Sequence, residues 1–143
     1  CEKLKILKVI IPLPQPPNNR IDGIPGGNVD RALDGAERPI RDWILLAFPN
    51  GQKLAIMSPD IFAADVSPTE VRLTLLRSPQ MAHHDPHPGR TIDGRTSDHG
   101  EHDFRIRLLL GGDTAPEALD AMAAGMLRPL TYADLTRGMP SHV

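Results

Sequence analysis

The chain has 143 residues, a length typical of one domain with its own core, and its net charge is −2. Because the chain has no excess of positive charge, we do not expect it to bind nucleic acid. No apolar run approaches the length of a membrane span. Only 3% of residues are aromatic, which disfavours carbohydrate binding by stacking. The single cysteine excludes an internal disulfide and fits a reducing compartment, so we expect a cytoplasmic protein.

The first third of the sequence predicts a strand, a loop and a second short strand. Residues 3–11 alternate lysine with leucine, isoleucine and valine, and because this pattern starts with no lead-in after Cys1, we expect a fragment of a longer protein. Residues 12–27 are rich in proline, asparagine and glycine, so we predict a loop there. A short strand is expected over residues 28–33.

The middle of the sequence predicts strands at short spacing. The apolar run 43–48 and the run 53–57 are separated by Asn50-Gly51, a strong signal for a hairpin. A further strand is expected over 61–66, before the turn Ser-Pro-Thr-Glu. Strands at this spacing with turn residues between them predict a β-sandwich.

Two strands then frame a long polar segment. Residues 71–75 alternate apolar and polar, as do residues 104–110, in which Phe104, Ile106, Leu108 and Leu110 are expected to share a buried face. We predict a long functional loop over residues 77–101. Thr114-Ala-Pro-Glu117 is a capping box, which predicts a helix over residues 114–128, packed through Leu119, Met122, Ala123 and Met126.

Five of the six histidines lie between these two strands, together with acidic residues. Imidazole and carboxylate groups suit zinc, although the spacing does not follow the His-Glu-x-x-His pattern. The alternative is a polar loop whose side chains bond backbone groups. The residues concerned are His83, His84, Asp85, His87, Asp98, His99, Glu101 and His102.

Three short motifs in this region point to a family. They are Leu-Thr-Leu-Leu-Arg-Ser-Pro at 73–79, His-Asp-Pro at 84–86, and Asp-His-Gly-Glu-His-Asp-Phe at 98–104. In this order and spacing they resemble the C-terminal β-domain of glycoside hydrolase family 38 α-mannosidases. The resemblance covers most of the chain, and residues 12–27 are the least similar part.

The resemblance implies a mainly β fold, a β-sandwich of the galactose-mutarotase-like (supersandwich) type with one helix near the C-terminus. Residues 1–143 would form a single, partial domain of this type. The parent enzymes hydrolyse terminal α-mannosides with retention, using Zn²⁺ and an aspartate nucleophile. Those groups belong to α/β and helical regions that this chain lacks, so we expect no catalytic residue, no cofactor and no activity here. The expected partners are those regions and a mannoside substrate, with neither nucleic acid nor a membrane.

Four residues are predicted to serve the substrate cleft: Arg77, Asp85, Asp98 and His102. The resemblance implies that Arg77 lines the cleft, where its guanidinium can donate to sugar hydroxyls or a carboxylate. Asp98 and His102 could support that corner, or could only tie a loop to backbone amides. The alternative function is a stand-alone metal- or carbohydrate-binding module that uses the His-rich loop 83–102, and a structural domain without a site also stays open.

Overall fold

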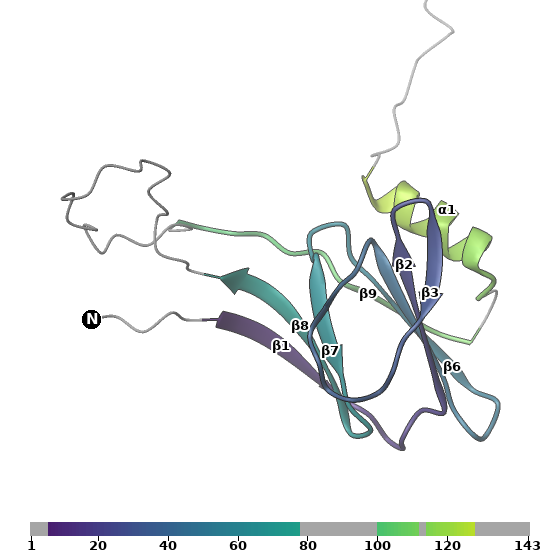
Figure 1. The fold of residues 1–143 in the computed structure, drawn as a ribbon. Helices are drawn as coiled ribbons and strands as arrows, with labels where there is room; N and C mark the ends of the chain where they lie inside the picture. The colour runs from purple at the N-terminus through teal and green to yellow at the C-terminus, as the bar shows by residue number, and fades with distance from the viewer. Residues whose placement is uncertain (1–5, 78–99, 112–113, 128–143) are drawn as a thin grey trace, which may run out of the picture.

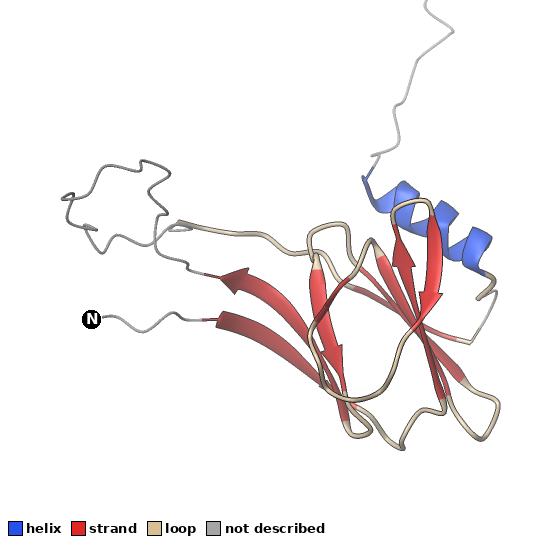
Figure 2. Ribbon diagram, viewed as in Figure 1, coloured by secondary structure: helices blue, strands red, loops and turns tan. Residues whose placement is uncertain are grey.

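The structure is a computed structural model in which residues 6–77, 100–111 and 114–127 are described. The chain is mainly β, with two antiparallel sheets packed against each other and one helix near the C-terminus (Figures 1 and 2). This architecture confirms the predicted fold class, a mainly β sandwich with a single C-terminal helix among the described residues.

Nine strands build the two sheets in the described part of the chain. The four-stranded sheet contains, in spatial order, β1 (Ile6–Pro12), β8 (Glu70–Arg77), β7 (Ala63–Val66) and β4 (Arg38–Pro39). The five-stranded sheet contains, in spatial order, β3 (Gly27–Asp30), β2 (Asn19–Ile24), β5 (Trp43–Ala47), β6 (Lys53–Met57) and β9 (Arg107–Leu110). Strands β1 and β9 each form one edge of their sheet.

The predicted hairpin is confirmed as β5 and β6, with Trp43 opposite Met57 and Ala47 opposite Lys53. Gly51 in the turn has a φ of 82°, which explains why glycine follows asparagine there. Successive side chains of β5 enter two different cores. Ile44 and Leu46 join the core between the sheets, whereas Trp43 and Leu45 join the core beneath the helix. The run is therefore continuously apolar because both of its faces are buried.

The helix α1 (Pro116–Leu127) covers the outer face of the five-stranded sheet (Figure 1). Its bounds fall within the predicted range 114–128. Leu119 and Ala123 are buried, and Met122 and Met126 pack against the same core, so the predicted apolar face is confirmed. The Trp43 indole Nε1 donates to Asp120 Oδ1 at 2.7 Å, which connects the helix to β5.

The prediction of a loop over residues 12–27 is wrong. Strand β2 (Asn19–Ile24) lies inside that range and pairs with β3 through a turn at Gly26, whose φ is 84°. Proline and glycine there mark the strand ends and the turn, and the intervening residues form a regular ladder. The strand predicted over 28–33 is β3, which begins at Gly27 and ends at Asp30.

The strand predicted over 104–110 is shorter than expected, because only Arg107–Leu110 forms β9. Phe104 and Ile106 pack against the core between the sheets, as predicted. Leu108 and Leu110 do not share that burial, and they are 52% and 79% exposed. They lie on an edge strand, at the periphery of the core. The long loop predicted over 77–101 falls mostly on residues 78–99, which lie outside the described residues.

Gly23 provides a test of this packing. A Cβ atom at Gly23 would lie 2.5 Å from the Arg41 carbonyl oxygen, which accepts from the Trp43 amide, and 2.8 Å from Trp43 Nε1, which donates to Asp120. We expect Gly23→Ala to lower the free energy of unfolding by at least about 2 kcal/mol through overpacking. Gly27→Ala is the matched control, because its Cβ would meet nothing within 4 Å. Urea unfolding followed by Trp43 fluorescence measures both variants, and equal stabilities would contradict the packing described here.

Candidate functional site

Arg77, the principal residue of the predicted site, is the last residue of β8. Its guanidinium forms an ion pair with Glu37, which also accepts a hydrogen bond from Lys8 Nζ at 2.7 Å. The Arg77 side chain is 56% exposed, whereas Glu37 is 21% exposed. The carboxylate thus holds a partly exposed guanidinium at the strand end where the chain enters the Arg-Ser-Pro motif.

This pair is one end of an ion-pair network that runs across the four-stranded sheet. Lys8 also bonds Asp65, Asp65 accepts from Arg72, and Arg72 Nε lies 3.5 Å from Glu70 Oε1. The network consists of Glu70, Arg72, Asp65, Lys8, Glu37 and Arg77. Positive and negative groups alternate along it, so each interior charge has an opposite charge on both sides.

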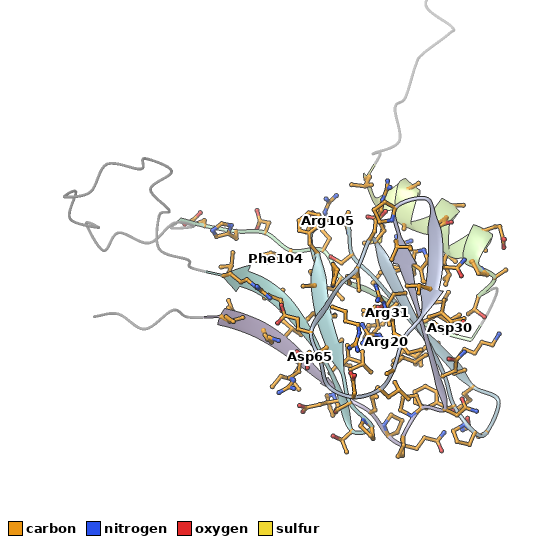
Figure 3. All side chains as sticks on the ribbon, in the orientation of Figure 1. Arg20, Asp30, Arg31, Asp65, Phe104 and Arg105 are labelled. Atoms are coloured by element: carbon orange, nitrogen blue, oxygen red, sulfur yellow. The ribbon has the colours of Figure 1, made fainter. Side chains whose placement is uncertain are left out.

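Asp65 is the buried centre of the ion-pair network (Figure 3). Burial alone would raise the pKa of its carboxyl group. Hydrogen bonds and charges from Lys8 and Arg72 outweigh burial and lower the pKa below its ordinary value. The same contact raises the pKa of Arg72. Asp65 is therefore ionised at neutral pH and ties β1 and β8 to β7.

His102, the second predicted site residue within the described ranges, stacks on Phe104. The ring centroids are 6.2 Å apart and the planes are inclined by 20°. Phe104 packs against the core between the sheets, so the imidazole is anchored to the sandwich. His102 thus belongs to a ring contact and Arg77 to the ion-pair network.

The segment that leads from His102 into β9 is fixed by Arg105. Its Nε and Nη2 donate to the two carboxylate oxygens of Asp60 at 3.0 and 2.9 Å, and its Nη1 donates to the Met126 carbonyl at 2.9 Å. The side-chain hydrogen bond from Arg105 lowers the pKa of Asp60. One arginine therefore connects this segment both to the turn after β6 and to the end of α1.

Of the remaining predicted residues, Glu101 is described and exposed, and the others are not placed. Asp85 and Asp98, with His83, His84, His87 and His99, lie outside the described residues, so neither a substrate role nor a metal role is tested for them. Within the described ranges, no three His, Cys, Asp or Glu side chains gather in a way that could hold a metal ion. None of the helical residues described forms a span long and apolar enough to cross a membrane.

The sequence analysis missed a buried ion pair in β2. Arg20 Nε and Nη2 donate to the two oxygens of Asp22, each at 2.7 Å, and both side chains are fully buried. Arg31 Nε lies 3.7 Å from Asp22 Oδ2. Burial raises the pKa of Asp22 although Arg20 and Arg31 oppose it. The two-residue spacing, which places both side chains on one face of a strand, was the available signal.

Comparison of the chain with protein-family models, with curated proteins and with solved structures gave no match.

The ion-pair network predicts a specific pH dependence. Because the folded-state pKa of Asp65 is lowered, its stabilising contribution is present above the unfolded value of 3.8 and is lost as pH falls through the folded value. We expect Asp65→Asn to lower the free energy of unfolding by about 2 kcal/mol at pH 7, the scale of a charged hydrogen bond. The difference from the wild type should shrink below pH 3.8.

Urea unfolding of both proteins between pH 2.5 and pH 7 measures that difference. Asp30→Asn is the matched control, since Asp30 is an exposed carboxylate on β3 outside the ion-pair network. A difference between Asp65→Asn and the wild type that stays constant with pH would show that Asp65 contributes through packing and not through its charge.

Proposed function

We propose that this chain is a non-catalytic β-domain of a family 38 α-mannosidase. In this role it braces the catalytic region and contributes Arg77 to the wall of the mannoside cleft. The observation that carries the proposal is the position of Arg77, which ends β8 within the Leu-Leu-Arg-Ser-Pro motif and is held there by Glu37. A guanidinium fixed at a strand end offers donors to sugar hydroxyls at little cost in side-chain entropy.

The division of roles within the enzyme supports this proposal. Retaining hydrolysis of an α-mannoside needs a carboxylate nucleophile, and in this family the zinc ion supplies electrostatic stabilisation at the reacting sugar. The resemblance assigns both groups to the α/β and helical regions. On that assignment, the residues described here orient and enclose the substrate and carry no bond-making step.

The bracing role is supported by exposed apolar side chains on two of the edge strands, β1 and β9. Ile6, Leu7 and Ile10 of β1 are 52%, 53% and 58% exposed, and Leu108 and Leu110 of β9 are also exposed. Unpaired edge strands with apolar side chains favour pairing or packing with another part of a protein. We assign that part to the catalytic region of the same parent chain. Figure 1 shows β1 and β8 extending away from α1, which leaves the β1 edge accessible.

The proposal is tested on the natural gene product, isolated from its own cells. We expect an intact mass several times that of 143 residues and hydrolysis of 4-nitrophenyl α-D-mannopyranoside. In that enzyme, Arg77→Gln should lower kcat/KM by about tenfold to hundredfold, the effect of losing one charged hydrogen bond. The unfolding midpoint should stay close to that of the wild type.

Arg107→Gln is the matched control, because Arg107 is an exposed arginine on β9. A natural product of 143 residues that does not hydrolyse the mannoside would overturn the assignment. If Arg77→Gln lowered the unfolding midpoint and left kcat/KM unchanged, the role of Arg77 in the cleft would be withdrawn and the domain assignment would stand.

A further inference from the structure

A cleft opens where the β2–β3 turn, the linker into β5 and the last turns of α1 meet. It consists of two adjoining hollows of about 380 Å³ and about 680 Å³. Both hollows are lined by Ile24, Arg41, Asp42 and Leu127, so they lie next to each other. The volume of each hollow is in the range of small-molecule sites.

The larger hollow is apolar. Its walls include Pro25, Pro39, Ile40, Pro59 and Phe62. Phe62 is 73% exposed, which is high for a phenylalanine in a chain that contains only three. An aromatic ring presented beside three prolines offers a rigid apolar surface that loses little entropy when a ligand covers it.

The smaller hollow has a mixed polar and apolar lining, with an excess of negative charge. Its charged lining residues are two carboxylates, Asp42 and Asp120, and one guanidinium, Arg41. Arg41 Nε donates to Asp42 Oδ2 at 3.2 Å, and the Trp43 indole donates to Asp120 Oδ1, so each contact uses one carboxylate oxygen. The carbonyl end of α1 is at the same place, since Leu127 is the last helical residue, and the Arg105 guanidinium binds the Met126 carbonyl there.

Backbone hydrogen bonds hold the walls of the cleft in place. The Ile40 amide donates to the Phe62 carbonyl at 3.0 Å, and the Arg41 amide donates to the Gly23 carbonyl at 2.8 Å. The Ser58 amide donates to the Asp42 carbonyl at 2.8 Å, and Asp42 has a φ of 65°. This left-handed backbone turns the linker between the two hollows. The site is thus largely pre-formed, which lowers the cost of binding.

We propose that this cleft binds a small organic cation, a protonated amine joined to an apolar body. The ammonium group lies between Asp42 and Asp120, and the apolar body extends along Phe62 and the prolines. Charge complementarity selects the cation over an anion of equal size, and the apolar hollow selects against a simple metal ion or ammonia. This site does not depend on the mannosidase proposal, because it uses neither Arg77 nor the ion-pair network.

The test compares three probes that share one apolar body: 2-phenylethylamine, 2-phenylethanol and 3-phenylpropionate. They are titrated at pH 7 into the ¹⁵N-labelled 143-residue chain, and proton–nitrogen NMR spectra are recorded. The single tryptophan gives an unambiguous reporter, since its indole donates to Asp120 in the cleft wall. We expect the amine to shift the Trp43 indole signal and to bind at least about tenfold more tightly than the carboxylate.

Three variants separate charge from apolar contact. Asp42→Asn should weaken amine binding by about threefold to fivefold, the effect of one partly exposed charge pair, and asparagine accepts the left-handed backbone at this position. Asp120→Asn keeps the acceptor for Trp43 and removes the charge. Phe62→Ala should weaken all three probes equally. Asp30→Asn is the control that removes a carboxylate outside the cleft and should leave every affinity unchanged.

Equal affinities for the amine and the carboxylate would overturn the proposal, as would signals that shift only outside the cleft. A Trp43 signal that moves with protein concentration in the absence of probe would assign the cleft to a second copy of the chain, and would also overturn it. None of these results depends on mannoside hydrolysis, so the cation site and the proposed function are tested independently, and either one can be wrong without the other.

Discussion

The two-sided burial of the β5–β6 hairpin is the constraint on which the architecture depends. One face of the hairpin is buried by the four-stranded sheet, and its apolar side chains are Ile44, Leu46, Leu54 and Ile56. The other face is buried by α1 through Leu119 and Ala123. Its side chains are Trp43, Leu45, Ala55 and Met57. A hairpin that is apolar on both faces cannot form an outer layer of the protein, because one of its apolar faces would then be exposed to water. The sheet–sheet–helix order follows from that requirement.

Charged side chains are then arranged around these two apolar cores. The Arg20–Asp22 pair lies inside the sandwich, on the strand next to β5, where both oxygens of the carboxylate accept from one guanidinium. The ion-pair network lies across the four-stranded sheet with only Asp65 deeply buried. Buried pairs add little net stability compared with apolar packing, but losing one partner leaves a costly unpaired charge. The ion-pair network, through Lys8, Asp65 and Arg72, therefore acts mainly to hold β1, β7 and β8 together.

The sequence was sufficient to predict those elements whose apolar pattern follows directly from which side chains are buried. The β5–β6 hairpin, the helix face at Leu119 and Ala123 and the mainly β class were all predictable from periodicity and turn chemistry. Strand β2 was missed because proline, asparagine and glycine dominate residues 12–27, and the charged residues Arg20 and Asp22 gave no apolar alternation, although they pair with each other in the interior. Leu108 and Leu110 were wrongly predicted to be buried. Alternation shows which side chains share one face of a strand, but it does not show whether another element packs on that face.

The candidate site was predictable only in its residue types. Arg77 was identified from a motif, but its partner Glu37 lies far away in sequence and has no local signal that links the two. The cleft beside Phe62 was missed for the same reason, since the β2–β3 turn, the linker into β5 and α1 come together only in the folded chain. Pairing across long sequence separations depends on the sheet topology, which a single sequence constrains weakly.

The short segment from Glu37 to Asp42 joins the two sites that the proposals use. Glu37 holds Arg77, and five residues later Asp42 lines both hollows of the cleft. Energetic coupling between two sites requires a connecting element with two arrangements that both sites bias. Here the connecting segment is pinned on both sides: Arg38 is bidentate to Asp34, and the Ile40 and Arg41 amides bond Phe62 and Gly23. An element held by so many bonds in one arrangement positions both sites and transmits little between them, so a cation in the cleft should leave the environment of Arg77 unchanged.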